Sequence, residues 1–300
     1  MNLKGRLSVI RYGMLAVLVL PLVLAAVKTV QLLLFFDAET GMLSSGKGAN
    51  FLQWILWIGG GIVLAVGSWM TFELRRAKGY YLPAPTLEEG VGLFAAGICF
   101  FGQAVSDLLL IMEDRRLKIG GANGDISWLQ VVVSAAGLLL AAALIVMAYR
   151  MIATGKRPPA LVGALPAVWC MLFMLSLMYT FENVVSVQEN TVKTLTGVLA
   201  MMCSYYLGRS CSGIDGREES IGGVWFRLVF PGIGFAASMP YCVAYLMQVR
   251  ERAGNVPYLA VMGLSLWAGV SAVQLCRRAA AGLRRQAAAV RKRESGGGAS

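Results

Sequence analysis

Two charged residues, Lys28 and Asp107, stand inside long apolar stretches of the sequence, LAAVKTVQLLL and FGQAVSDLLL. Each lies sixteen residues after the predicted start of its membrane span, which places both side chains about 24 Å along helices of the same polarity. A charge near the bilayer centre costs at least ~2.5–3.5 kcal/mol, and opposite charges at one depth offset that cost if their helices touch. The sequence therefore predicts an ion pair between Lys28 and Asp107.

Polar side chains extend this candidate site. Gln31 follows Lys28 by three residues and Gln103 precedes Asp107 by four, so each glutamine shares a helical face with its charged neighbour. Tyr179 and Glu182 lie at the end of a later span, on the same side of the membrane. We expect a polar pocket that opens outward and handles a ligand or ion through Lys28, Gln31, Gln103, Asp107, Tyr179 and Glu182.

A structural explanation of these charges stays open. Lys28 could extend its ammonium along its own stem toward the headgroups. Asp107 could lie near enough to the headgroups to be hydrated, or the two residues could form an ion pair that serves only stability.

The composition indicates that this chain is embedded in a lipid bilayer. Of its 300 residues, 57% are hydrophobic and 14% are charged, whereas soluble domains carry about 25% charged residues. The apolar residues form blocks of about 20, the length that a helix needs to cross ~30 Å of hydrocarbon. We predict an all-α polytopic membrane bundle, one domain over residues 1–276, with eight helices at roughly 12–36, 51–72, 91–112, 129–152, 161–182, 191–210, 224–247 and 256–276.

The positions of the basic residues and of asparagine predict the topology. Most of the 27 lysine and arginine residues fall beside the termini and after the even-numbered spans, so the positive-inside bias predicts cytoplasmic N- and C-termini in the cell membrane. Asparagine precedes every even-numbered span, at positions 50, 123, 190 and 255. This pattern indicates four tandem helical hairpins, arising either by duplication or because asparagine caps helices and arginine marks cytoplasmic ends.

Small residues predict where helices approach closely. Thr196, Ala200, Ser204 and Gly208 recur every four residues, and small residues on one face let helices associate in lipid. Prolines inside spans are expected to kink them; they are Pro166, Pro231 and Pro240. The six cysteines form no CxxC motif and are expected to act as small packing residues.

The residue types argue against an enzyme. The chain has no histidine, which excludes His-based triads and nearly all zinc catalysis. Glu88 and Glu89 resemble a paired-carboxylate site, but TLEE, with Thr86 three residues before Glu89, is the pattern of a helix capping box. We expect no catalytic residues, no metal and no cofactor.

The residues after the last span form a basic segment, RRAAAGLRRQAAAVRKRE. Its basic clusters recur every seven residues and therefore share one helical face, with a drift of ~20° per step. We expect the eighth span to continue inward, within residues 277–300, as a cytoplasmic Ala-rich helix. It would bind anionic lipid headgroups through Arg277, Arg278, Arg284, Arg285, Arg291, Lys292 and Arg293. A topology signal without a partner, or an acidic protein partner, are the alternatives, and nucleic acid is not the expected partner.

Three classes of function agree with these features. The favoured one is a transporter-like carrier of a small solute that uses the polar patch around Lys28 and Asp107. The others are a membrane sensor or receptor that signals through a membrane protein partner, and a non-catalytic structural subunit of a membrane complex. Arg227, near the start of the seventh span, is expected to anchor that span at the interface.

Overall fold

The chain folds into a bundle of long helices. The computed structural model describes residues 3–37, 42–43, 46–76, 86–117, 128–157, 159–179, 187–213, 220–247 and 258–296. Within these ranges the elements are α1 (Leu3–Phe35), β1 (Phe36–Asp37), β2 (Met42–Leu43), α2 (Lys47–Arg76), α3 (Leu87–Leu117), α4 (Trp128–Thr154), α5 (Ala160–Tyr179), α6 (Val187–Ser212), α7 (Ile221–Leu246) and α8 (Tyr258–Gly296). The predicted all-α bundle of eight helices is confirmed, and the one addition is the antiparallel β1–β2 pair after α1.

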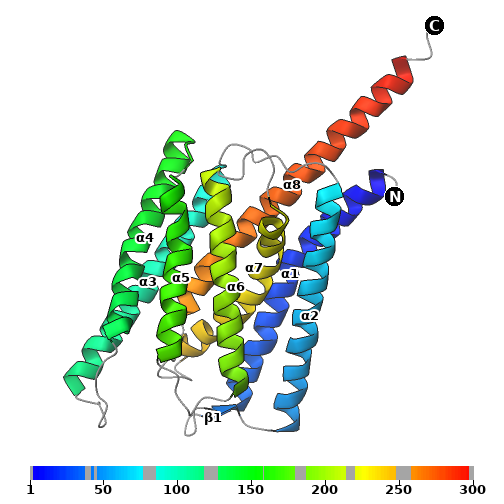
Figure 1. Cartoon of the computed structure of the whole chain (residues 1–300). Helices are drawn as coiled ribbons and strands as arrows, with labels where there is room; N and C mark the ends of the chain where they lie inside the picture. The colour runs from blue at the N-terminus through cyan, green and yellow to red at the C-terminus, as the bar shows by residue number, and fades with distance from the viewer. Residues whose placement is uncertain are drawn as a thin grey trace.

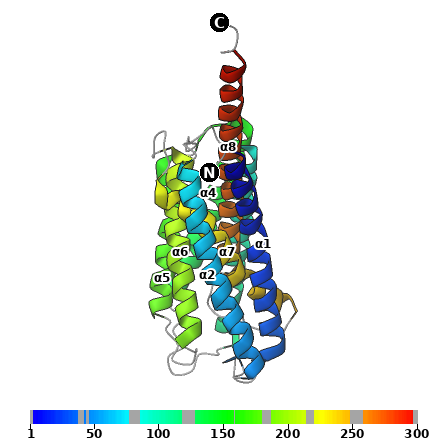
Figure 2. The ribbon, with the colours of Figure 1, turned by 90° about the vertical axis from the view of Figure 1, so that its right-hand side faces the viewer.

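Six of these helices, α1, α2, α3, α4, α7 and α8, are long and apolar enough to cross a membrane. The described part of α5 contributes a shorter apolar segment, Val162–Ser176, and α6 is not among the six. Both lie alongside the other helices in the bundle (Figures 1 and 2). The molecule is therefore a membrane-spanning helical bundle.

Helices that follow one another in the chain pack as hairpins, namely α1–α2, α3–α4, α5–α6 and α7–α8. The hairpins are not in equivalent positions, because α7 and α8 occupy the centre. The helix α7 contacts α1, α2 and α6, while α8 contacts α1 and α3 extensively. As the views show, α8 lies between α1 and α3, and both chain termini lie at one end of the bundle (Figures 1 and 2). We call this the terminal end, and the opposite one the far end.

Two helix boundaries follow from local sequence. The predicted capping box begins α3: the Glu89 backbone N–H donates to Thr86 Oγ1 at 3.2 Å, and the Thr86 N–H donates to Glu89 Oε2 at 3.5 Å. The helix α4 ends before Gly155, whose φ of 62° lies in the left-handed region. Its N–H donates to the Met151 carbonyl at 3.1 Å, which satisfies one of the carbonyls that a helix end leaves unpaired.

Aromatic packing holds α3, α4 and α5 together. The Trp169 ring meets Phe100 edge to face at 4.7 Å and stacks on Phe173 at 5.8 Å. Its indole N–H donates to the Val133 carbonyl of α4 at 3.1 Å. A buried indole thus gains both apolar contact and a hydrogen bond, which explains why this tryptophan lies inside rather than at the membrane interface.

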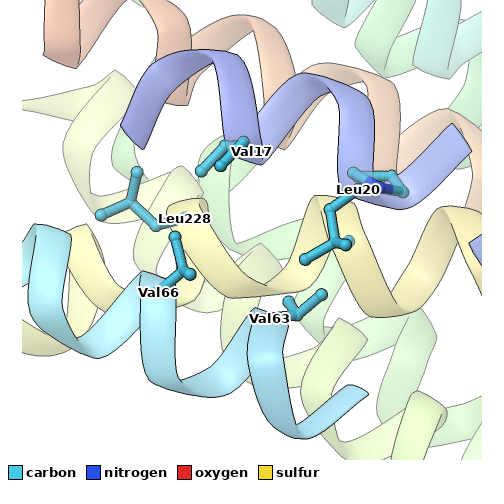
Figure 3. A pocket seen from close by; sticks show the side chains of 8 residues that line it. Val17, Leu20, Val63, Val66 and Leu228 are labelled. Atoms are coloured by element: carbon cyan, nitrogen blue, oxygen red, sulfur yellow. The ribbon is translucent and has the colours of Figure 1, made fainter. Parts of the chain in front are cut away.

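At the junction of α1, α2 and α7 the side chains of Val17, Leu20, Val63, Val66 and Leu228 converge around a small space (Figure 3). Its volume is about 10 Å³. A water molecule needs about 10–15 Å³ of such space together with polar partners. These five side chains are apolar, and they leave only a small space between the three helices.

The predicted seam of small residues on α6 faces α5. Thr196, Ala200 and Ser204 are buried, and a Cβ at Gly208 would fall onto the carbonyl oxygen of Gly163 in α5. The two backbones therefore approach as closely as glycine allows, which is the packing that small residues permit in lipid.

We predict that Gly208→Leu separates α5 from α6 and lowers the thermal unfolding midpoint of the detergent-solubilised protein. Overpacking of this kind costs about 1–3 kcal/mol. The control is Gly61→Leu on α2, because a Cβ at Gly61 would have no neighbour within 4 Å. Equal midpoints for the two variants would contradict the close α5–α6 contact.

Candidate functional site

The first polar cluster joins α1 to α2 at the far end. Lys28 Nζ donates to Gln31 Oε1 at 2.9 Å, so the predicted shared face is confirmed. Gln31 is 1% exposed, and its Nε2 donates to the Ala49 carbonyl and to Gln53 Oε1, each at 3.1 Å. This arrangement places the Lys28 ammonium beside the amide oxygen of Gln31, and Gln31 in turn links α1 to α2. Gln53 is a member that the predicted site did not include.

The second polar cluster joins α3 to α8. Gln103 Nε2 donates to Asp107 Oδ1 at 2.8 Å, which again confirms the predicted shared face. Gln103 Oε1 accepts from the Leu259 backbone N–H at 3.1 Å. Leu259 is the second residue of α8, and the first N–H groups of a helix have no partner within that helix. The buried glutamine therefore caps α8 from another helix, and Asp107 orients it.

The predicted ion pair between Lys28 and Asp107 is wrong for the described residues. None of the ion pairs formed there joins the two side chains, whose hydrogen bonds lead to Gln31 and Gln103 instead. The physical reason is the position of α8, which packs against both α1 and α3 and holds them apart. Tyr258, its first residue, stacks on Tyr241 of α7 at 4.2 Å and belongs to a buried cluster with Leu32 of α1.

Two of the candidate residues add nothing to this geometry. Tyr179 is the last residue of α5, but its side chain lies outside the described part of the structure, and so does the whole of Glu182. Their membership of a polar pocket stays a prediction.

The basic segment is a direct continuation of α8. The helix runs without a break from Tyr258 to Gly296, and its last turns extend beyond the bundle (Figures 1 and 2). The helix passes residue 277 without a break, which confirms the expectation that the last span continues into the basic segment. Leu283 is 1% exposed and packs in a cluster with Ile10 of α1 and Leu74 of α2. The first turns of the basic segment therefore belong to the bundle.

Two of the predicted lipid-binding residues bind acidic side chains of α3. Arg277 Nη1 lies 3.0 Å from Glu88 Oε1 and 3.2 Å from Glu88 Oε2. Arg278 Nη1 lies 3.7 Å from Glu89 Oε1. Glu89 thus serves both the capping box and an ion pair. Arg284 and Arg285 are exposed, and the side chains of Arg291, Lys292 and Arg293 lie outside the described part.

Arg227 was expected to anchor α7 at the membrane interface, and the structure places it elsewhere. Its side chain is 3% exposed, inside the bundle rather than at the lipid interface. The neighbouring Trp225 is only partly buried, and its indole N–H donates to Ser68 Oγ of α2 at 2.9 Å. Position in the span did not distinguish these two residues, because only packing decides which side of α7 faces lipid.

The remaining reactive side chains form no site among the described residues. All six cysteines are free thiols, and Cys170, Cys203 and Cys276 are buried. In the part of the chain that the structure describes, no three acidic or cysteine side chains gather in a way that could hold a metal ion.

No family model, no curated protein and no solved structure matches the chain.

We predict that Gln103→Leu lowers the free energy of unfolding by about 1–3 kcal/mol, because the Leu259 N–H is left without an acceptor in an apolar environment. Asp107→Asn keeps an acceptor for Gln103 and should cost less. Thermal unfolding of both variants in detergent measures the difference. An Asp107→Asn loss that exceeds the Gln103→Leu loss would show that the carboxylate, rather than the cap, governs this cluster.

Proposed function

We propose that this protein is a non-catalytic, carrier-like membrane protein that binds a small solute with an anionic group at the Lys28 cluster. The observation that supports the proposal is the placement of the Lys28 ammonium in a largely apolar stretch of α1, beside Gln31 and, through it, Gln53. Ionisable residues inside membrane spans are costly and mark solute or ion pathways more often than other positions do.

The location of the cluster supports a binding role. It lies between α1 and α2 near the far end, where Gln53 and Lys28 are only partly buried. The junction of α1, α2 and α7 is lined by apolar side chains and leaves a space of only about 10 Å³. A carrier with this geometry binds its solute from the far end and must separate α1 from α2 or α7 to release it at the terminal end.

Asp107 has a different role in this proposal. Its hydrogen bond to Gln103 supports the cap of α8, on the side of α8 away from α1. The carboxylate therefore serves as a positioning residue for α8 and is not a ligand for the solute.

A sensor is the second candidate, and the unbroken course of α8 favours it. This helix joins the Gln103 cap at the far end to the basic segment beyond the terminal end. A change at the cap would be transmitted along one rigid element. A sensor would change the protease sensitivity of residues after Leu283 on ligand binding without any solute uptake into vesicles, whereas a carrier would show uptake.

We also propose that the terminal end faces the cytoplasm of a cell whose plasma membrane holds the protein. The support is the enrichment of lysine and arginine at that end.

The predicted orientation is tested by labelling with a membrane-impermeant maleimide. Lys47→Cys at the far end should react in intact cells, and Lys156→Cys, in the exposed segment after α4, should react only after permeabilisation. The parent protein, with its six native cysteines, is the control for background labelling. The reverse pattern would invert the topology.

The proposed solute site is tested by a thermal-shift screen of the detergent-solubilised protein against small carboxylates, phosphates and sulfonates. A ligand at 100 times its Kd stabilises the folded state by about 2.7 kcal/mol. We expect Lys28→Gln to abolish the shift, and Lys47→Gln, an exposed lysine at the same end, to retain it. Asp107→Asn should also retain it. A ligand that stabilises Lys28→Gln as much as the parent protein would remove Lys28 from the site.

A further inference from the structure

A groove runs between α1 and α3 toward the terminal end, and α7 and α8 form its floor. Its volume is about 530 Å³, within the ~300–1,000 Å³ of small-molecule sites. The lining is almost entirely apolar and includes Leu18 and Leu22 of α1, Leu87 and Val91 of α3, Phe235 of α7 and Val270 of α8. Leu18, Leu22, Leu87 and Val91 are exposed, so the groove is accessible from the lipid.

The groove exists because α8 separates α1 from α3, and because the side chains of α8 do not fill the space between them at this level. Gly269 lines the floor, and a Cβ at this position would lie 3.7 Å from Pro231 Cβ, in ordinary contact. A glycine here is therefore not required by close backbone packing. Its effect is to leave space above the floor.

Charged side chains close the terminal end of the groove. Arg277 and Glu88 both line it and are bonded to each other, with side chains 58% and 51% exposed. Arg11 lies seven residues before Leu18, and Arg284 lies seven residues after Arg277. A spacing of seven keeps each arginine near the face of its helix that lines the groove. Both are exposed, so cations exceed acids at this end.

The dimensions agree with one lipid chain. The lining residues of α8 run from Ser265 to Arg277, which is about 18 Å of helix. Half of a ~30 Å hydrocarbon core is about 15 Å, the depth of one leaflet.

We propose that this groove binds an anionic phospholipid. One acyl chain lies against Val270 and Phe235, and the phosphate binds Arg277, with Arg11 and Arg284 beside it. Guanidinium groups bind phosphate through paired, charge-assisted hydrogen bonds. Glu88 competes with the phosphate for Arg277, so the ion pair observed between them opens when the lipid binds. This site is independent of the solute site at Lys28.

The test uses the full-length protein in nanodiscs that contain equal amounts of phosphatidylglycerol and phosphatidylcholine with identical acyl chains. Native mass spectrometry after transfer to detergent counts the lipids that stay bound and gives the ratio of the two kinds. Arg277→Gln should lower the ratio of anionic to neutral lipid about fivefold, the effect expected for one cation at the headgroups. Glu88→Gln should raise the ratio, because it frees Arg277.

Filling the groove by substitution distinguishes binding of the lipid acyl chain from binding of the lipid headgroup. Gly269→Leu should reduce retention of both lipids, and Gly61→Leu on the exposed face of α2 should not. Arg75→Gln, an exposed arginine at the end of α2, controls for a general loss of positive charge. If Gly269→Leu fails to fold, the opposite shifts expected for Arg277→Gln and Glu88→Gln still decide the outcome.

Three results would overturn the proposal. They are an unchanged lipid ratio in Arg277→Gln, undiminished retention of both lipids in folded Gly269→Leu, and retention of a second protein copy in place of lipid.

Discussion

The pairing of α3 with α8 is the constraint on which the rest of the bundle depends. These antiparallel helices are joined at the far end by the hydrogen bond from the Leu259 N–H to Gln103, and at the terminal end by the ion pairs of Glu88 with Arg277 and Glu89 with Arg278. Between the ends, a Cβ at Gly263 would meet Ala96 and Cys99 of α3, so the backbones approach closely there. Because α8 is held along α3 and also packs on α1 and α7, it becomes the central element that separates α1 from α3.

That central position explains where polar and apolar features occur. A bilayer offers no water to unpaired backbone groups, so the start of α8 needs an acceptor from a neighbouring helix, and buried Gln103 supplies it. On the α1 side of α8, a buried glutamine has a similar role. Gln31 accepts a hydrogen bond from Lys28 and links it to α2. Both polar clusters lie toward the far end, while apolar side chains line the junction of α1, α2 and α7 and most of the groove between α1 and α3. The position of α8 between α1 and α3 thus accounts both for the missing ion pair and for the lipid-facing groove.

Local patterns predicted local structure well. The capping box at Thr86 and Glu89, the contacts within each of the pairs Lys28–Gln31 and Gln103–Asp107, and the seam of small residues around Gly208 all formed as expected. Each depends on residues within one or two helical turns, where helix geometry alone sets the neighbours. Predictions across helices were less secure. Equal depth of Lys28 and Asp107 said nothing about which helices touch, and the interfacial role expected for Arg227 depended on which face of α7 is buried.

The amino-acid sequence by itself determined that this chain lives in a membrane, that it forms eight helices, and that successive helices make hairpins, because hydrophobic block length and short connections leave few other folds in lipid. The tertiary structure alone decided that α7 and α8 are central, that Gln103 caps α8, that Arg277 and Arg278 meet acids of α3, and that a groove separates α1 from α3. Lipid tails are as apolar as the helix surfaces, so hydrophobicity does not select the neighbours of a membrane helix. Close packing and a few hydrogen bonds and ion pairs select them, and those depend on side chains far apart in the sequence.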